Sequence, residues 1–275
     1  MEIKFNNVEY NPSKTSILLD INTEFKDKTI NGIAGKSGSG KTTLIELIDA
    51  LIIPTKGYIK VGRRIISSDG VKNVNNYRSQ IGLVLKKAEE QFICDTVKEE
   101  IQVGMKAFKK THKDIDKHTK DALLMVGLDE TYLDRNPNTL SSGEKKKVAI
   151  ASVLAFNPKV LILDEPTIGL DNQSKENLIK IIKMLKNRYE KTIIIVSNDT
   201  DLLLKICDQV TILDKGKVVL EGKKYDVFTK DIEQYGLKKP KIIEFEQLVL
   251  KEKKIKMLYR DEINDLMKDV YRYVK

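Results

Sequence analysis

A glycine-rich stretch with two lysines and two threonines has the residue types that bind phosphate. The stretch GKSGSGKTT at residues 35–43 fits the spacing G-x-x-x-x-G-K-[ST]. Glycines let the backbone wrap tightly, so that successive N–H groups point at phosphate oxygens. Lys41 would bridge the terminal phosphates of a nucleotide, and the Thr42 hydroxyl would bind Mg²⁺. The predicted phosphate-binding residues are Gly35, Lys36, Ser37, Gly38, Ser39, Gly40, Lys41, Thr42 and Thr43.

A pair of carboxylates supplies the second half of such a site. Asp164 and Glu165 end the aliphatic run VLILDEP. Asp164 would hold Mg²⁺ through water, and Glu165 would orient the attacking water or accept its proton. Acidic residues can also simply cap a strand, but their pairing with the glycine-rich loop favours a nucleotide site.

The elements around these residues alternate between strands and helices. The aliphatic run INGIAG leads into the glycine-rich loop, and TTLIELIDALI then has a helical apolar face ending before Pro54. Strand-like runs return at 160–164, 192–196 and 209–214, separated by helical patterns. Such alternation predicts a parallel sheet covered on both faces. The opening EIKFNNVEY and LLDINTEF alternate with period two, which predicts an N-terminal antiparallel region.

Two further segments are predicted beside this core. Residues 88–158 have helical spacing, with Gly127 closing one turn, and form an inserted helical subdomain. GKVVLEG is predicted to be a closing hairpin strand. We expect an α/β protein with one domain at residues 1–225 and a small C-terminal extension at 226–275.

Composition narrows the class of protein. The 275 residues are 41% hydrophobic and 32% charged, as in an ordinary soluble globular protein. A net charge of +9 suits polyanions, but the lysines are spread along predicted helix faces. Cys94 and Cys207 have no metal-ligand spacing, and a reducing cytosolic setting is expected. The sequence has no signal peptide and no window long enough to span a membrane, so membrane work would be done from the side.

The order of these motifs resembles the ATP-binding subunits of ABC transporters, P-loop NTPases, over about residues 1–225. LSSGEKKKVAIASVLAFNPKVLILDEPTIGLD carries the likeness. The resemblance implies that Ser141 and Gly143 belong to a signature that closes over a partner's ATP, and that Asp171 lies in a loop crossing the dimer interface. Ser141 and Glu144 also form a capping-box pattern, which explains the helix start without any nucleotide. Both can hold at once.

Three positions depart from the family pattern. Lys86 stands where a glutamine senses Mg²⁺ and water, and Asn198 stands where a histidine contacts the γ-phosphate. Pro12 stands where an aromatic ring stacks on adenine in the family, so that stacking is either weakened or supplied by Tyr10 after a local shift. Asparagine donates through a neutral amide and cannot take up a proton. Losing one well-placed donor costs on the order of 100–1000-fold in rate.

These departures predict an asymmetric heterodimer of two homologous ATPases. This chain would hold the slower site, and its LSSGE would close the partner's site. Glu165 is intact, so the site is not expected to be dead. Neutral drift is the alternative explanation of all three departures.

Two segments resemble the ATPases of energy-coupling factor importers, which take up vitamins and other micronutrients. They are EEQFICDTVKEEIQVGMKAF and the tail LEGKKYDVFTKDIEQYGLKKPKIIEFEQLVLK. The likeness implies peripheral attachment to the cytoplasmic face of the membrane, through an integral coupling component and a substrate-binding membrane component. A groove near residues 86–96 would receive a helix of the coupling component. The C-terminal extension would hold the two ATPases together, or act as a stabilising cap.

Two other functions fit parts of the sequence. A soluble ABC ATPase acting on nucleic acid or the ribosome is supported only by basic charge, because the chain has one cassette and no sustained heptads; no specific nucleic acid is expected. A regulatory subunit that binds nucleotide with little hydrolysis would tolerate Glu165→Gln without loss of transport.

Overall fold

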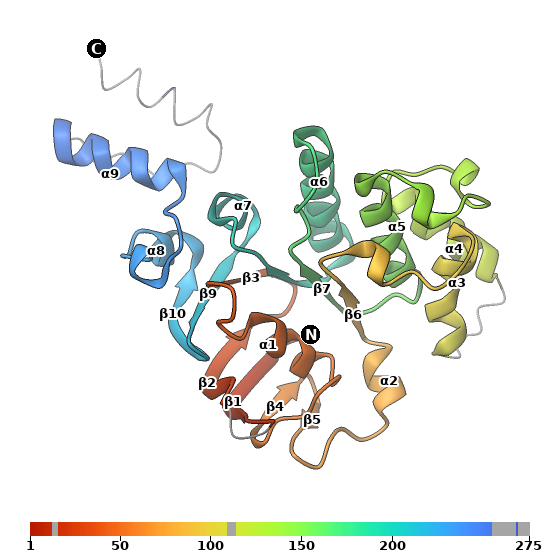
Figure 1. Cartoon of the computed structure of the whole chain (residues 1–275), viewed down its shortest axis with the longest axis horizontal. Helices are drawn as coiled ribbons and strands as arrows, with labels where there is room; N and C mark the ends of the chain where they lie inside the picture. Colours follow the sequence, from red (N-terminus) through yellow and green to blue (C-terminus); the bar gives the residue numbers. More distant parts are fainter. Residues whose placement is uncertain (13–15, 109–113, 255–267, 269–275) are drawn as a thin grey trace.

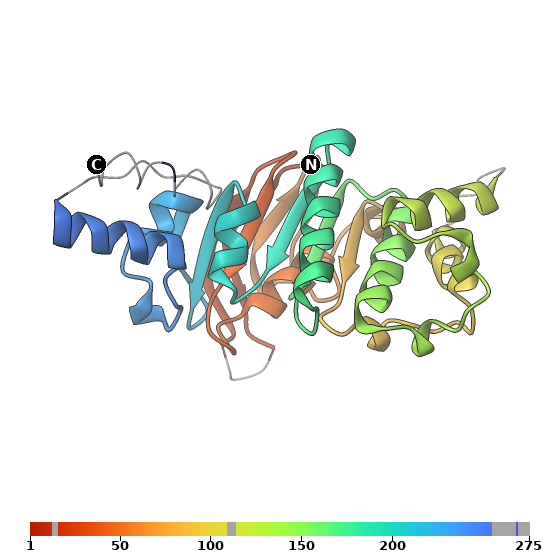
Figure 2. The same cartoon turned by 90° about the horizontal axis from the view of Figure 1, so that it is seen from above.

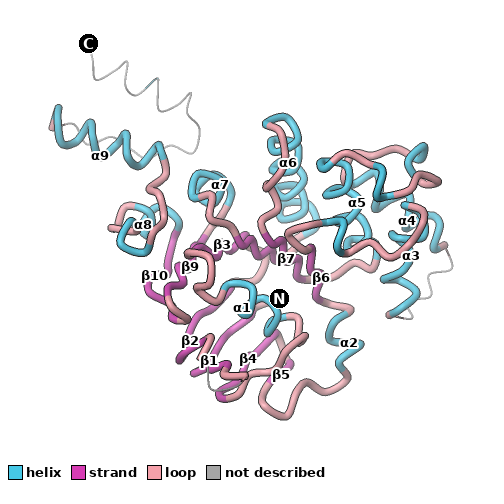
Figure 3. The backbone as a smooth tube through the Cα atoms, in the orientation of Figure 1, coloured by secondary structure: helices cyan, strands magenta, loops and turns pink. Residues whose placement is uncertain are grey.

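The larger of two sheets forms the centre of the protein (Figures 1 and 3). The computed structural model describes residues 1–12, 16–108, 114–254 and 268. The strand order is β10-β9-β3-β8-β7-β6. The strands are β3 (Ile30–Ala34), β6 (Ile81–Val84), β7 (Val160–Asp164), β8 (Thr192–Val196), β9 (Gln209–Asp214) and β10 (Lys217–Lys223). Neighbours pair in parallel except β9 and β10, which form an antiparallel hairpin. The predicted mostly parallel sheet and the closing hairpin strand are therefore confirmed.

A second, antiparallel sheet packs against one face of the first. Its order is β2-β1-β4-β5. The strands are β1 (Ile3–Tyr10), β2 (Leu18–Phe25), β4 (Lys56–Val61) and β5 (Arg64–Ile66). Alternate residues of β1, such as Phe5, are buried between the sheets, where Phe5 meets Phe25 edge to face with 6.1 Å between ring centroids. Period two thus identified the antiparallel region correctly.

Helix α1 (Lys41–Ile48) lies in the core between the two sheets, directly after the glycine-rich loop. The helix is shorter than the predicted segment, which ran to residue 52. Ala50 takes a positive φ of 55°, and the Leu51 N–H reaches back to the Glu46 carbonyl at 2.9 Å. This left-handed closure ends the helix despite the apolar residues that follow.

Helices α6 (Asn172–Tyr189) and α7 (Thr200–Ile206) cover the other face of the larger sheet (Figure 2). Their apolar side chains, Ile182 and Leu203 among them, share one core with Ile193 of β8. Because β8 is buried on both faces, its residues form the continuous aliphatic run TIIIV.

The helices of the 88–158 region gather beyond β6 at one end of the molecule (Figures 1 and 2). They are η1 (Ala88–Glu90), α3 (Val97–Ala107), α4 (Ile115–Met125), η2 (Glu130–Tyr132), η3 (Pro137–Thr139) and α5 (Ser142–Ala155), and α2 (Val74–Arg78) precedes β6. Gly127, with φ 71°, follows the end of α4 as expected. The Ser141–Glu144 capping box is present at the start of α5.

The C-terminal elements lie at the opposite end of the molecule (Figure 1). They are α8 (Lys224–Phe228), η4 (Glu233–Tyr235) and α9 (Lys241–Lys253). Pro240 precedes α9 directly. The remainder of the predicted extension, apart from Lys268, lies outside the described residues. The boundary between 225 and 226 stays a prediction.

Candidate nucleotide site

The predicted phosphate loop and both predicted carboxylates meet in one pocket of about 290 Å³. It opens where β3, β6, β7 and β8 end, at the carboxyl edge of the parallel sheet, the usual ligand position in such folds. Its lining residues are Ile17, Ser37, Gly38, Gly40, Lys41, Thr42, Thr43, Lys86, Asp164, Glu165 and Asn198. The structure therefore brings together residues predicted from four separate parts of the sequence.

Close packing constrains two glycines of the loop, Gly35 against backbone and Gly40 against a leucine side chain. A Cβ atom on Gly35 would stand 2.2 Å from the Leu213 carbonyl oxygen, and one on Gly40 would stand 2.6 Å from Leu18 Cδ2. Both glycines also have positive φ, 154° and 103°. Gly38 differs, because a Cβ there would meet nothing within 4 Å and its φ alone favours glycine.

Lys41 is buried, with 9% of its surface exposed, and its ammonium group is held by the loop. The ammonium donates to the carbonyl oxygens of Gly35 and Lys36, the latter at 2.8 Å. Burial lowers the pKa of Lys41, an effect that Glu165 and Asp164 oppose. The loop thus curls around its own lysine and places that cation beside the two carboxylates.

The buried Ser39 hydroxyl has no hydrogen-bond partner among the described residues. Buried polar groups are normally paired, so an unpaired one calls for a ligand or a water. The Ser39 N–H is used within the loop, donating to the Lys36 carbonyl at 3.1 Å. Ser39 does not line the pocket, however, so this hydroxyl belongs to the interior of the loop and is not evidence for a bound phosphate.

Asp164 lies beside a cluster of three lysines. Burial raises the pKa of Asp164, the neighbouring Glu165 raises it further, and Lys86, Lys41 and Lys146 oppose this. Among the described residues no group of three or more His, Cys, Asp or Glu side chains could hold a metal by itself. Thr42 and Asp164 fit Mg²⁺ in another way, because this ion commonly takes one or two carboxylates and completes its shell with phosphate and water.

Glu165 is oriented by the residues that follow β8. The Ser197 hydroxyl donates to one Glu165 carboxylate oxygen at 2.9 Å, and the Asn198 backbone N–H donates to the other at 3.2 Å. Glu165 itself has a positive φ of 43°, an unusual conformation for a non-glycine residue. Sequence reasoning missed Ser197, although a hydroxyl residue directly before Asn198 at the end of a buried strand was a usable signal.

Four predicted residues outside the phosphate loop take no part in lining this pocket. Ser141 caps α5, and Asp171 caps α6 by accepting from the Ser174 N–H at 2.9 Å. A Cβ on Gly143 would stand 3.0 Å from Ser174 Oγ, so the starts of α5 and α6 are in contact. Tyr10 packs against the core between the sheets, and Ile17 occupies the pocket edge instead.

Lys36, Gly35 and Ser39 belong to the loop without lining the cavity. The Lys36 side chain lies against Gly236, where an added Cβ would collide with Lys36 Cε. These three residues shape the loop.

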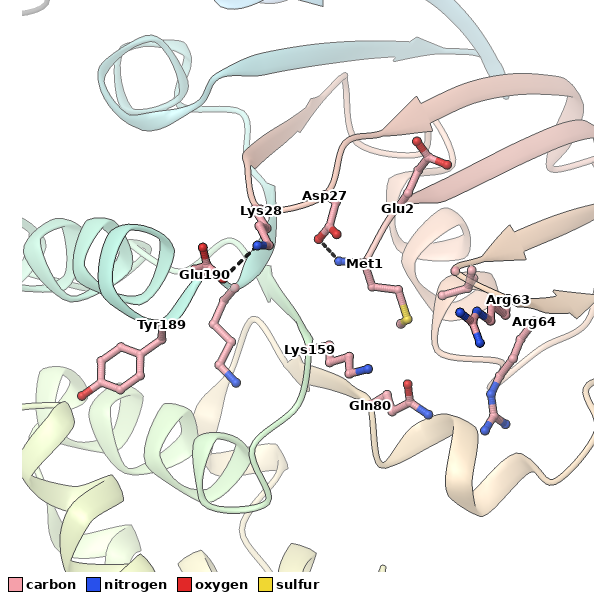
Figure 4. Close-up of a pocket in the computed structure, with 13 residues that line it drawn as sticks. Met1, Glu2, Asp27, Lys28, Arg63, Arg64, Gln80, Lys159, Tyr189 and Glu190 are labelled. Carbon is pink, nitrogen blue, oxygen red and sulfur yellow. Dashed lines mark hydrogen bonds and ion pairs between the residues drawn. The ribbon is translucent and has the colours of Figure 1, made fainter.

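A larger cavity of about 810 Å³ lies near the amino ends of the parallel strands (Figure 4). Several of its charges are already paired, Lys28 with Glu190 at 2.8 Å and the Met1 amino group with Asp27. It contains none of the predicted site residues. Volume alone therefore does not identify the functional site here.

The fold and the pocket define a P-loop nucleotide-binding protein of the α/β class. The family model described as "ABC transporter" matches residues 18–168. The chain is 38% identical over 250 residues to an energy-coupling factor transporter ATP-binding protein, EcfA2, of Clostridium perfringens, covering 88% of this chain and 87% of that one. The EcfA2 protein of Enterococcus faecalis is 36% identical over 260 residues, covering 91% and 90%.

Two solved structures show the same fold. One is cbiO1 of Clostridium perfringens, described as part of the ABC transporter complex cbiONQ, with a TM-score of 0.75 and 31% identity over 89% of this chain and 98% of that one. The other is a dimeric ATP-binding cassette in a post-hydrolysis state with ADP and phosphate, with a TM-score of 0.72 and 27% identity over 81% and 98%. The chain belongs to the ABC transporter ATP-binding proteins, in the energy-coupling factor group. It is an ATPase.

Proposed function

We propose that this chain is the ATPase of an energy-coupling factor importer, in which the described pocket binds ATP with Mg²⁺. The observation that carries the proposal is the convergence of Lys41, Thr42, Asp164 and Glu165 on one cavity. Lys41 would contact the terminal phosphates, and Thr42 with Asp164 would hold Mg²⁺. The metal would neutralise charge on the phosphate oxygens. Glu165, fixed from two sides, would orient the attacking water.

The same pocket supports a slow rate at this site. Asn198 is exposed at the pocket and offers a neutral amide. Lys86 adds a cation near Asp164, where it competes electrostatically with a metal ion. Glu165 keeps both its hydrogen bonds, because one comes from Ser197 and the other from the backbone of residue 198. We therefore expect reduced hydrolysis with ATP binding retained.

We propose a homologous ATPase subunit as one partner of this chain. The N-terminal end of α5, with exposed Ser141 and Ser142 and half-buried Gly143, lies outside this chain's own pocket. An exposed helix N-terminus is suited to a phosphate group. A related cassette forms a dimer in a post-hydrolysis state. These observations support a dimer in which this chain's LSSGE closes the partner's site. The departures at Lys86 and Asn198 favour a heterodimer whose partner holds the faster site.

A groove of about 330 Å³ supports a membrane partner. It lies between β6 and α3, and its apolar lining includes Leu51, Ile93 and Phe108. Ile93 is 76% exposed, far more than an isoleucine usually is. Within the described ranges no helix could cross a bilayer. We propose that a helix of the integral coupling component fills this groove, holding the chain at the cytoplasmic face beside a substrate-binding component for a vitamin or other micronutrient.

ATP binding to Lys41→Ala tests the site assignment. Titration of the purified chain with Mg²⁺·ATP should give a Kd at least about tenfold weaker than wild type, because a phosphate contact is lost. Lys60→Ala, an exposed lysine on β4, is the matched control and should bind as wild type. Equal binding by wild type and Lys41→Ala would refute the assignment.

A further inference from the structure

Lys146 is a buried lysine on α5 whose side chain extends to the segment directly after β6. Only 4% of its surface is exposed. Its ammonium group donates to the carbonyl oxygens of Leu85 at 3.1 Å and Lys86 at 2.7 Å. These carbonyls belong to the segment that leaves β6, whose pairing with β7 ends at Val84 and Leu163. Lys146 therefore donates hydrogen bonds to the backbone directly after the last residue of β6 that pairs with β7.

The segment held by Lys146 faces two functional surfaces. The Lys86 side chain lines the nucleotide pocket, whereas Leu85 lines the apolar groove beneath α3. A second clamp comes from Gln91, whose side-chain oxygen accepts from the Leu85 N–H at 3.2 Å. The backbone at residue 85 is thus held through its carbonyl by Lys146 and through its N–H by Gln91.

Burial of the Lys146 ammonium group is unfavourable unless hydrogen bonds compensate for the lost water. Burial lowers the pKa of Lys146, while Glu89 and Asp164 act in the opposite direction. A buried cation that loses its partners is strongly unfavourable, so the two carbonyls and the ammonium must stay together. Neighbouring Lys145 and Lys147 are more exposed and serve a different face of α5.

We infer that Lys146 is a positioning residue, which fixes the Lys86 side chain in the nucleotide pocket by holding the Lys86 backbone to α5. Ser141 caps the same helix, so Lys146 connects this chain's own pocket with the helix start that we propose faces the partner's nucleotide. The inference rests on the proposed nucleotide site, and the Lys41→Ala titration tests that site separately.

A double-mutant cycle on ATP affinity tests the inference. Mg²⁺·ATP is titrated into wild type, Lys86→Met, Lys146→Met and the double variant, with Lys145→Met as the control on the same helix. If Lys146 acts through Lys86, each single change alters the Kd by about tenfold in the same direction, and the double variant matches the single ones. Lys146→Arg, which keeps a cation able to donate to both carbonyls, should restore the Kd to within about threefold.

Hydrogen exchange provides the readout that general destabilisation would not reproduce. Amides of residues 85–91 should exchange faster in Lys146→Met, while those of β7 and β8 stay at wild-type rates. Additive effects in the cycle, an unchanged Kd in Lys146→Met, or uniform acceleration of exchange across the core would each overturn the inference. If Lys41→Ala binds ATP normally, the nucleotide site itself is wrong.

Discussion

At the scale of single residues, the position of the Glu165 carboxylate does not depend on which side chain stands at residue 198. Ser197 and the backbone N–H of Asn198 hold the carboxylate whatever side chain stands at 198. If residue 198 faces the γ-phosphate and Glu165 orients the attacking water, as we propose, then asparagine in place of histidine changes the group at the phosphate and leaves the Glu165 carboxylate held in place. A slow site is the expected result.

Removal of the Ser197 hydroxyl tests the first half of this view. Ser197→Ala should lower ATP turnover at this site by about tenfold, because Glu165 loses one of its two hydrogen bonds. ATP affinity should stay unchanged. Ser152→Ala is the control, since Ser152 is also buried but bonds to Ala149 within α5. Steady-state turnover with the partner's site silenced measures the effect, and an unchanged rate would contradict the assigned role.

Restoring the family residue tests the second half. Asn198→His should raise turnover at this site by about 10- to 100-fold, because an imidazole adds a donor that can carry charge. The same single-site assay applies. A rate at or below that of wild type would mean that Asn198 is not what limits hydrolysis here.

The sequence predicted this site well where spacing along the chain carries the information. The loop at 35–43 and the Asp164–Glu165 pair were recognised because each is a local pattern that needs a strand before it. Ser197 and Lys146 were missed because their roles depend on partners 32 and 60 residues away. The sequence left open whether Tyr10 or no ring stacks on adenine, and this question stays a prediction. Tyr10 itself packs against the core between the sheets, which the spacing did not reveal.

At the scale of elements, α1 joins the nucleotide pocket to the apolar groove. It begins after Gly40 at the phosphate loop and ends at Asp49, which lines the groove together with Arg78. Burial raises the pKa of Asp49 to about 7, although Arg78 opposes the shift. A carboxylate at the carboxyl end of a helix is also unfavourable for the helix dipole.

The raised pKa of Asp49 predicts how the free energy of unfolding changes with pH. The folded state binds the Asp49 proton more tightly than the unfolded chain does. The contribution of Asp49 to stability is therefore full below about pH 3.8, falls as the pH rises to about 7, and is constant above that. Asp49→Asn cannot ionise, so at pH 8 it should be more stable than wild type by about 1–3 kcal/mol.

Denaturant unfolding at pH 5, 6, 7 and 8 measures the effect. The advantage of Asp49→Asn should grow with pH and level off above pH 7. Asp69→Asn makes the same chemical change at an exposed aspartate and should show no such trend. An advantage independent of pH would contradict the assigned ionisation.

Element existence was easier to predict than element length. Strand runs such as TIIIV were predicted correctly, because a strand buried on both faces is made mostly of aliphatic residues. The end of α1 was predicted four residues too late, because no glycine or proline marks the left-handed turn at Ala50.

At the scale of the whole molecule, the helical region and the C-terminal elements lie at opposite ends of the sheet core (Figure 1). Leu85 lines the groove and Lys86 lines the nucleotide pocket, so we expect the segment that follows β6 to carry a change from one site to the other. This arrangement supports an ATPase that passes closure of its dimer to a membrane partner through a single short segment.

The groove can be tested apart from catalysis. Ile93→Asp should reduce co-purification with the membrane component by about tenfold, because a charge replaces an exposed apolar side chain in a docking surface. ATP affinity should not change. Ile65→Asp is the matched control, since Ile65 is 55% exposed on β5, away from the groove. Equal loss in both variants would mean that the groove has no special part in assembly.

Turnover of the assembled complex tests the central claim most directly, namely that this chain holds the slower of two ATP sites. The complex of this chain with its partner ATPase and membrane component is compared with two variants, Glu165→Gln here and the matching change in the partner. We predict that the change in the partner removes nearly all ATP hydrolysis and that Glu165→Gln leaves most of it. If Glu165→Gln alone stops turnover, Asn198 and Lys86 are tolerated in a fully working site, and the asymmetric account is wrong.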